Sequence, residues 1–134
     1  MTSRTLAKHI AELMLSKKAN DVVMLDLRKL TSVTDYFVVC SAESDTQVKA
    51  IADAVQEGLE QRGETCYHRE GISALQWVVL DYVDVVAHIF YHEARSFYNL
   101  ERLWADAKRT TVTDALEKTG KSSRKRKKET SVEL

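Results

Sequence analysis

Residues 36–63 read YFVVCSAESDTQVKAIADAVQEGLEQRG, and this stretch decides the fold. It opens with a short apolar run of strand length, Tyr36 to Cys40, and continues to Ser44, which has capping-box spacing with Gln47. Apolar residues then recur at helical spacing until Gly63, which occupies the usual place of a helix C-cap. These apolar residues are Val48, Ile51, Ala52, Val55 and Leu59. The stretch therefore predicts a strand followed by a crossover helix.

On the N-terminal side, Ser3 is a candidate N-cap for a helix of about four turns. Its apolar face contains Leu6, Ile10, Leu13 and Met14. A second apolar run, 22–27, predicts a strand that the polar segment 28–35 joins to the strand at 36–40. Both strands are apolar except for Asp26, which predicts that they are covered on both faces.

On the C-terminal side, 65–69 alternates weakly and predicts an edge strand. The apolar runs 77–81 and 84–91 flank Tyr82-Val83 and predict a hairpin. A single apolar stripe then predicts a last helix, with Phe97, Leu100, Leu103, Trp104 and Ala107 on one face.

The resulting order, α-β-β-α-β-β-β-α, predicts an α/β (α+β) domain with a mixed sheet of about five strands packed with helices. We expect the domain to span residues 1–109 and residues 110–134 to form a basic, disordered tail. Strand order cannot be derived from this pattern.

The chain has 20 basic and 20 acidic residues, but they are unevenly distributed. Segment 118–134 carries seven basic and two acidic residues, a net +5, so residues 1–117 carry −5. A basic tail can bind RNA phosphates by counterion release, or it can serve only as a solubilising appendage. The sequence leaves both possibilities open.

Several classes of protein are disfavoured by what the sequence lacks. No apolar run approaches the roughly 18 residues of a membrane span, and the first residues do not lead into a signal peptide, so we expect a cytosolic protein. Cys40 and Cys66 are predicted to be reduced thiols. The chain has four glycines, and Gly120-Lys121-Ser122 resembles only the end of a phosphate-binding loop, because Ala115 stands where a glycine is required.

Metal-dependent catalysis is also disfavoured. Cys66 and His68 would share one face of a strand about 7 Å apart, without further ligands of suitable spacing. No Asp-x-Asp occurs, and the acidic pair Glu43 and Asp45 lies at a helix start, where carboxylates suit the helix dipole. We expect no cofactor, no metal and no enzymatic activity. A metal-dependent nucleotidyltransferase that uses Glu43 and Asp45 remains the enzymatic alternative.

The candidate site is a group of acids around two aromatic residues. Glu70, Asp81 and Asp84 bracket Trp77 and Tyr82, a composition that fits an Arg/Lys-rich protein surface. The alternative is that Trp77 belongs to the core and that the acids solvate strand ends. From the residues alone the two interpretations have nearly equal weight.

The sequence resembles the ribosomal silencing factor family, also called Iojap, over roughly residues 5–107. The segments that carry the resemblance keep their order and spacing: DVVMLDL at 21–27, TDYFVVCS at 34–41, Ser44, QV at 47–48, AIAD at 50–53, EG at 70–71, WVVLDY at 77–82, DVV at 84–86, HIF at 88–90 and R-x-FY-x-LE-x-LW at 95–104.

The resemblance implies a nucleotidyltransferase-like fold without that fold's catalytic carboxylates. It implies a cytosolic homodimer that binds the large ribosomal subunit through the subunit's fourteenth L-series protein. There it would block joining of the small subunit and lower translation under nutrient limitation, with the basic tail able to contact rRNA.

The sequence departs from the family pattern at two positions. The family usually has glycine where this chain has Ala42 and Val83. A positive φ at either position would be costly, most of all for the β-branched Val83.

Overall fold

Six strands form one mixed sheet in the order β3-β4-β5-β2-β1-β6. The computed structural model describes residues 1–113. The elements are α1 (Ser3–Ser16), β1 (Asn20–Asp26), β2 (Tyr36–Ala42), α2 (Asp45–Glu60), β3 (His68–Glu70), β4 (Trp77–Asp81), β5 (Val85–Tyr91), α3 (His92–Tyr98), α4 (Leu100–Leu103) and β6 (Lys108–Thr111). None of the described helices is long and apolar enough to cross a membrane.

The centre of the sheet is the parallel pair β2 and β5, in which Val38 lies opposite Ala87. All other neighbouring strands are antiparallel. The predicted crossover is confirmed, because the chain leaves β2, passes through α2 to the edge strand β3, and then returns through β4 to β5 beside β2. The predicted hairpin of β4 with β5 is confirmed, and β1 and β2 also pair in antiparallel fashion.

β6 is a sixth strand that the sequence analysis did not predict. It pairs with β1 at the sheet edge, and all four of its residues are exposed. Such a strand has no buried side and therefore no apolar alternation to reveal it. It extends two residues beyond position 109, where we expect the domain to end, and the proposed tail lies largely outside the described residues.

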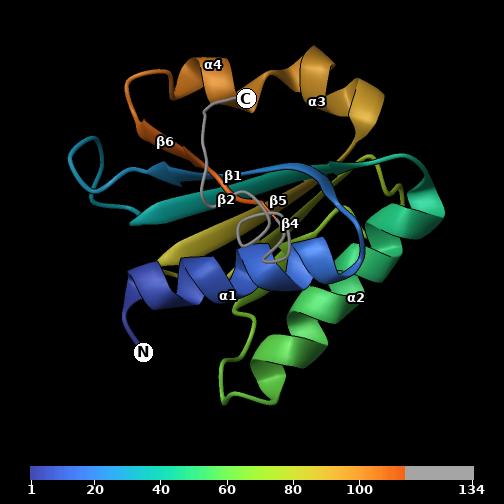
Figure 1. Ribbon diagram of the computed structural model, residues 1–134, viewed down its shortest axis with the longest axis horizontal. Helices are drawn as coiled ribbons and strands as arrows, with labels where there is room; N and C mark the ends of the chain where they lie inside the picture. The colour runs from blue at the N-terminus through green and yellow to red at the C-terminus, as the bar shows by residue number, and fades with distance from the viewer. Residues whose placement is uncertain (114–134) are drawn as a thin grey trace, which may run out of the picture.

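Helices α1 and α2 cover one face of the sheet, and α3 and α4 lie on the other (Figure 1). The apolar face predicted for α2 is buried as expected. Its N-cap is Ser44, whose Oγ accepts from the Gln47 N–H at 3.1 Å, and Gly63 follows the helix with φ 85°. For α1 the N-cap is Thr2 and not the predicted Ser3: Thr2 Oγ1 accepts from the Thr5 N–H at 3.1 Å.

The single C-terminal helix predicted from the 97–107 stripe is wrong. Asn99 adopts a left-handed conformation, φ 46° and ψ 53°, and divides the segment into α3 and α4. The break rotates the two halves relative to one another, so Leu100 is buried while Phe97 is 81% and Leu103 is 76% exposed. Asparagine tolerates this conformation better than most residues, which is why the chain can turn here.

Candidate functional site

Strand alternation divides the residues of β4 between the two faces of the sheet. Val78 and Leu80 are buried against α1 and α2. Trp77, Val79 and Asp81 therefore point to the face that carries α3 and α4. Cross-strand pairing brings Glu70 beside Val79 on the same face. Three of the predicted site residues, Glu70, Trp77 and Asp81, thus share one surface.

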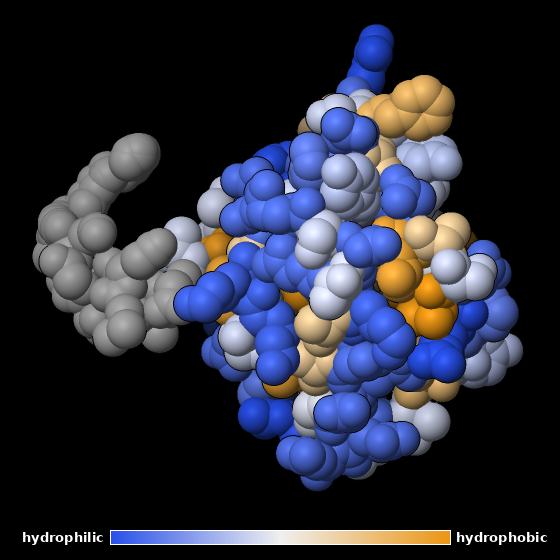
Figure 2. Space-filling model, turned by 90° about the vertical axis from the view of Figure 1, so that its right-hand side faces the viewer, coloured by the Kyte–Doolittle hydropathy of each residue, from blue (hydrophilic) through white to orange (hydrophobic). Residues whose placement is uncertain are grey.

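Helices α3 and α4 cover only part of this face. Beyond them the register adds Val86, opposite Asp81, and Phe37, opposite Val86. Val79, Val86 and Phe37 are only half-buried, and Tyr98, at the end of α3, is 48% exposed. We call the set Glu70, Trp77, Val79, Asp81, Val86, Phe37 and Tyr98 the β4 surface. Figure 2 shows isolated apolar groups at the top of the molecule, where α3 lies, among mostly hydrophilic neighbours.

Packing and one hydrogen bond hold the indole of Trp77 in place. Its ring stacks on Phe90 with centroids 5.0 Å apart and tilts against Tyr98 at 4.8 Å. Its Nε1–H donates to Nδ1 of His88 at 3.1 Å. Because burial disfavours the charged imidazole, the pKa of His88 falls to about 3 and the ring is neutral, which leaves one nitrogen, here Nδ1, to accept this bond. The exposed part of Trp77 is therefore presented in one orientation.

Carboxylates flank this aromatic group. Glu70 contacts the His68 ring at 2.7 Å, and Asp81 Oδ1 accepts from the Val83 N–H at 2.7 Å. Asp84 is exposed in the β4–β5 turn that follows Asp81. Within residues 1–113, none of these three carboxylates pairs with lysine or arginine. Their negative charge is available to a basic partner.

Tyr82 does not belong to this surface, contrary to the sequence analysis. Its side chain is 6% exposed and packs in the core on the α1 and α2 side of the sheet, opposite to Trp77. Burial raises the pKa of its phenol well above the ordinary value. Tyr82 continues the alternation of Val78 and Leu80, so its parity alone already places it on the face opposite Trp77.

The two positions at which the sequence departs from the family pattern behave differently. Ala42 is buried at the end of β2 and is not among the residues with positive φ. Val83 does adopt a positive φ, 73°, in a three-residue turn in which the Asp84 N–H donates to the Tyr82 carbonyl at 2.9 Å. The strain expected for a β-branched residue is therefore present at Val83.

The alternative catalytic pair is not arranged as a metal site. Glu43 accepts from the Asn20 side-chain amide at 2.7 Å, and Asp45 occupies the first turn of α2. Cys66 Sγ contacts the His68 carbonyl at 3.3 Å, while the His68 ring is engaged by Glu70. Among the described residues, no group of three or more His, Cys, Asp or Glu side chains converges to hold an ion. Cys40 and Cys66 are free thiols, and burial raises the pKa of Cys40 to about 12.

The sequence analysis missed Phe37, Val79, Val86 and Tyr98 as members of the β4 surface. Tyr98 was overlooked because the predicted stripe assumed one continuous helix. The strand residues could be assigned only once strand order was known, since they come from β2, β4 and β5. The alternation within 77–81 was the one local signal for Val79.

An open aromatic face, flanked by carboxylates that have no lysine or arginine partner among the described residues, is typical of a protein that binds a macromolecular partner. Comparison with known proteins gives the family. A family model described as "Ribosomal silencing factor during starvation" matches residues 1–133. The chain belongs to the ribosomal silencing factor family.

Individual relatives agree with this assignment. The chain is 38% identical to the ribosomal silencing factor of Bacillus subtilis over 107 residues, which cover 80% of this chain and 91% of the relative. It is 33% identical to the chloroplastic protein Iojap of Zea mays, with 77% of this chain and 43% of that protein covered. A crystal structure from Chromobacterium violaceum has a TM-score of 0.77 and 33% identity, covering 86% of this chain and 96% of that one.

Proposed function

We propose that this protein represses translation by binding the large ribosomal subunit through the subunit's fourteenth L-series protein and blocking the approach of the small subunit. The proposal includes lower translation under nutrient limitation and a cytosolic location. Membership of the ribosomal silencing factor family supports the ribosomal role, since the family description names both silencing and starvation. The contact protein and the block are our inference.

The observation that carries the proposal is the composition of the β4 surface. Trp77 packs against Phe90 and Tyr98 and donates a hydrogen bond to His88, so little side-chain entropy remains to be lost when a partner covers it. Glu70 and Asp81 lie on the same face and have no lysine or arginine partner within the described residues. An aromatic anchor surrounded by acids fits a partner with a basic surface, as ribosomal proteins generally require for contact with rRNA.

Repression by this route needs no chemical step. A stable interface buries about 800 Å² per partner, which leaves most of a domain of this size projecting from the surface to which it binds. A projecting domain excludes any second body that would dock at the same place. The β4 surface makes the contact with the large subunit, and the remainder of the fold obstructs the small subunit.

Two further parts of the proposal concern association. The basic tail, outside the described residues, adds rRNA contact by counterion release. The free protein is a homodimer.

The decisive experiment is sedimentation of the purified full chain with separated ribosomal subunits, followed by a subunit-joining assay. We expect co-sedimentation with the large subunit and fewer joined ribosomes. Failure to bind the large subunit would overturn the proposal, and normal joining at saturating protein would overturn the steric mechanism.

Residue variants connect this experiment to the β4 surface. Trp77→Ala, checked for folding by circular dichroism, should weaken large-subunit binding by tenfold or more, the usual effect of removing an aromatic hot spot. Glu70→Gln combined with Asp81→Asn should weaken binding and reduce its salt dependence. The matched control is Asp53→Asn combined with Glu57→Gln, which removes two carboxylates from α2 on the opposite side of the sheet. If the two double variants weaken binding equally, the β4 surface is not the surface that binds the large subunit.

A further inference from the structure

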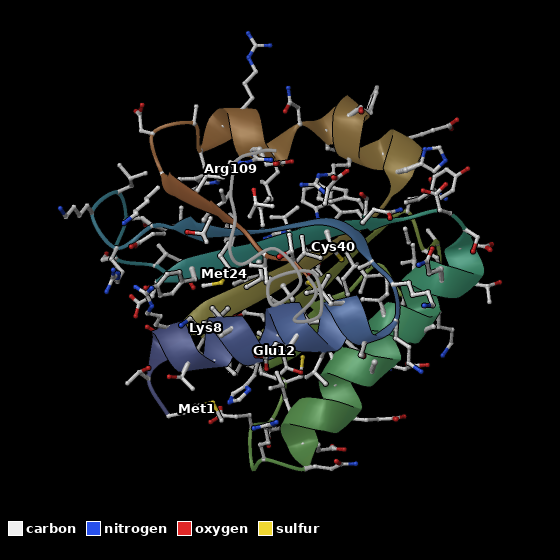
Figure 3. All side chains as sticks on the ribbon, viewed as in Figure 1. Met1, Lys8, Glu12, Met24, Cys40 and Arg109 are labelled. Atoms are coloured by element: carbon white, nitrogen blue, oxygen red, sulfur yellow. The ribbon has the colours of Figure 1, made fainter. Side chains whose placement is uncertain are left out.

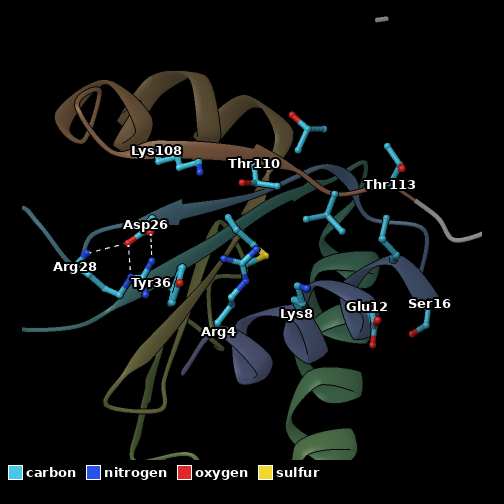
Figure 4. A pocket seen from close by; sticks show the side chains of 14 residues that line it. Arg4, Lys8, Glu12, Ser16, Asp26, Arg28, Tyr36, Lys108, Thr110 and Thr113 are labelled. Carbon is cyan, nitrogen blue, oxygen red and sulfur yellow. Dashed lines mark hydrogen bonds and ion pairs between the residues drawn. The ribbon is translucent and has the colours of Figure 1, made fainter. Parts of the chain in front are cut away.

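A second site lies on the opposite side of the sheet, between α1 and the edge strand β6. Helix α1 packs under β1 and β2, so β6 extends beyond the helix and leaves a hollow below it. The hollow has a volume of about 550 Å³, within the range of small-molecule pockets. Figure 4 shows this space between the side chains of α1 and those of β1 and β6.

Local geometry explains which side chains line the pocket. Arg4, Lys8 and Glu12 recur every fourth residue and therefore occupy one face of α1. Opposite α1, strand β6 contributes Lys108 and Thr110 to the lining, and these residues pair with Asp26 and Met24 of β1. Figure 3 shows Lys8 and Met24 on the α1 side of the sheet and Arg109 on the other side, as strand alternation requires.

The lining contains two acids, and one of them, Asp26, is tightly paired. Asp26 binds Arg28 through two hydrogen bonds, from Nε at 2.9 Å and from Nη2 at 2.7 Å, and this pairing lowers the pKa of Asp26 to about 2. Glu12 lies 3.5 Å from the ring of His9, and its carboxylate points away from β6. The lining therefore has four cations, Arg4, Lys8, Arg28 and Lys108, against the two carboxylates of Asp26 and Glu12, and keeps an excess of positive charge.

Three cations of the lining have no ion-pair partner within residues 1–113: Arg4, Lys8 and Lys108. The side chain of Arg4 extends from α1 toward β1 (Figure 4). Asp26, which lies opposite Lys108, offsets part of this charge, and an anion that enters the hollow would balance the excess that remains.

The rest of the lining is apolar or carries hydroxyl groups. Leu15, Met24 and Val112 supply apolar surface, and Thr110 supplies a hydroxyl. Tyr36 also lines the pocket: its side chain is 3% exposed, and its hydroxyl has no hydrogen-bond partner among the described residues. A buried polar group without a partner is uncommon and costs free energy, so it is a reason to look for a ligand.

We propose that this pocket binds a nucleoside di- or triphosphate. Arg4, Lys8 and Lys108 bind the phosphates, the ribose lies near the threonine hydroxyl of β6, and the base packs on Met24 and Leu15. An inorganic phosphate or an RNA backbone would satisfy the cations but would leave the apolar half of the pocket empty. The proposal goes beyond the proposed function, and the pocket lies on the opposite face of the sheet from the β4 surface.

The test is isothermal titration calorimetry of the full chain at low salt with four probes: ADP, GDP, pyrophosphate and adenosine. We expect ADP, GDP or both to bind saturably, with one nucleotide per chain. Pyrophosphate and adenosine should each bind at least tenfold more weakly, because each lacks one of the two halves that the pocket recognises.

Variants assign the binding to this pocket. Lys8→Ala and Arg4→Ala should each weaken nucleotide binding about tenfold or more, the usual effect of losing a charge-assisted hydrogen bond. Both side chains are exposed, so the fold should persist. The matched control is Lys49→Ala, an exposed lysine of α2 that does not line this pocket.

Three results would overturn the proposal: no saturable nucleotide binding, equal binding of pyrophosphate and nucleotide, or unchanged affinity in both pocket variants. A titration with single-stranded RNA tests whether the cations of the pocket bind the phosphates of an RNA backbone instead of a nucleotide. RNA binding lost in the same variants, without nucleotide binding, would replace the proposal by an RNA contact. No ribosomal subunit is used, so this proposal and the proposed function fail independently.

Discussion

His88 shows how one buried side chain controls the candidate surface without being part of it. The ring is 5% exposed, and its Nδ1 accepts the hydrogen bond from Trp77, while its Nε2 has no partner among the described residues. Phe37 packs edge-on against it with ring centroids 4.4 Å apart. Protonation would remove the acceptor and place a charge between aromatic rings, which is why the neutral form is favoured.

This burial makes stability depend on pH. The unfolded state binds a proton near the ordinary histidine pKa of 6.5, whereas the folded state does so only near 3, so acid favours unfolding throughout this interval. The free energy of unfolding should fall by about 2 kcal/mol between pH 7 and pH 5 because of His88 alone. Urea denaturation at the two pH values measures the loss.

His88→Gln keeps a hydrogen-bond acceptor and cannot titrate, so most of this pH dependence should disappear. His92→Gln, at an exposed histidine, should retain it. If His88→Gln and the unmodified chain lose the same stability between pH 7 and pH 5, His88 is not the group responsible.

Val83 combines an exposed side chain with a strained backbone conformation. It is 55% exposed, so its side chain contributes little packing, and its φ of 73° is a conformation that glycine adopts without strain. Val83→Gly should therefore raise the free energy of unfolding by about 1 kcal/mol, the strain released minus the added flexibility of the unfolded chain. Thermal or urea denaturation would show it. The same substitution at Val33, 82% exposed and without positive φ, should give no gain; a gain there as well would contradict the strain argument.

At the scale of elements, the connection from β3 to β4 determines where Glu70 and Trp77 lie. Gly71 follows β3 directly, has φ 88°, and its carbonyl accepts from the Leu75 N–H at 2.9 Å to close the loop. A Cβ on Gly71 would lie 2.0 Å from the Trp77 carbonyl oxygen. The loop can be this tight only because residue 71 has no side chain.

Gly71→Ala should consequently destabilise the protein and displace Trp77. We expect a loss of at least about 2 kcal/mol, since the cost of a left-handed residue adds to a backbone clash. Gly63→Ala is the matched control, because Gly63 has φ 85° but nothing within 4 Å of an added Cβ; it should cost only about 1 kcal/mol. Urea denaturation measures both losses, and tryptophan fluorescence should change in Gly71→Ala alone. Equal losses in the two variants would show that the clash is relieved elsewhere.

At the scale of the whole molecule, one ionic network joins segments far apart in the sequence. Arg95 of α3 binds Glu101 of α4 through Nε at 2.8 Å and Nη2 at 3.0 Å, and its Nη1 donates to the Asp21 carbonyl at 2.8 Å. Arg109 of β6 pairs with the same Glu101. The network fastens α3, α4 and β6 to the start of β1, and the bound guanidinium lowers the pKa of Glu101.

Glu101→Gln should lower the free energy of unfolding by about 2 kcal/mol, because the Arg95 side chain is only 12% exposed and would lose its charged partner. The control is Asp53→Asn, which removes an exposed ion pair with Lys49 and should cost less than about 1 kcal/mol. Urea denaturation at pH 7 compares them. Similar small losses would mean that the network contributes no more than a surface pair.

The sequence by itself determined the parts of the fold that depend on local pattern. Helix α2, its Ser44 cap and its buried face follow from a period of 3.6 residues and from capping chemistry, which are legible along a single segment. The strands β1, β2, β4 and β5 follow from continuous apolar runs, and the β4–β5 hairpin from their close spacing. Family membership followed from the order and spacing of these same blocks.

The tertiary structure alone decided how those elements assemble into surfaces. Strand order placed Phe37, Val79 and Val86 on one surface, although they come from three different strands. Asn99 divided a stripe that periodicity treats as one helix, and β6, exposed on every residue, left no apolar signal. Local propensity is encoded in neighbouring residues, whereas face, order and pocket depend on contacts between residues far apart in the chain, and a single sequence carries no direct record of those contacts.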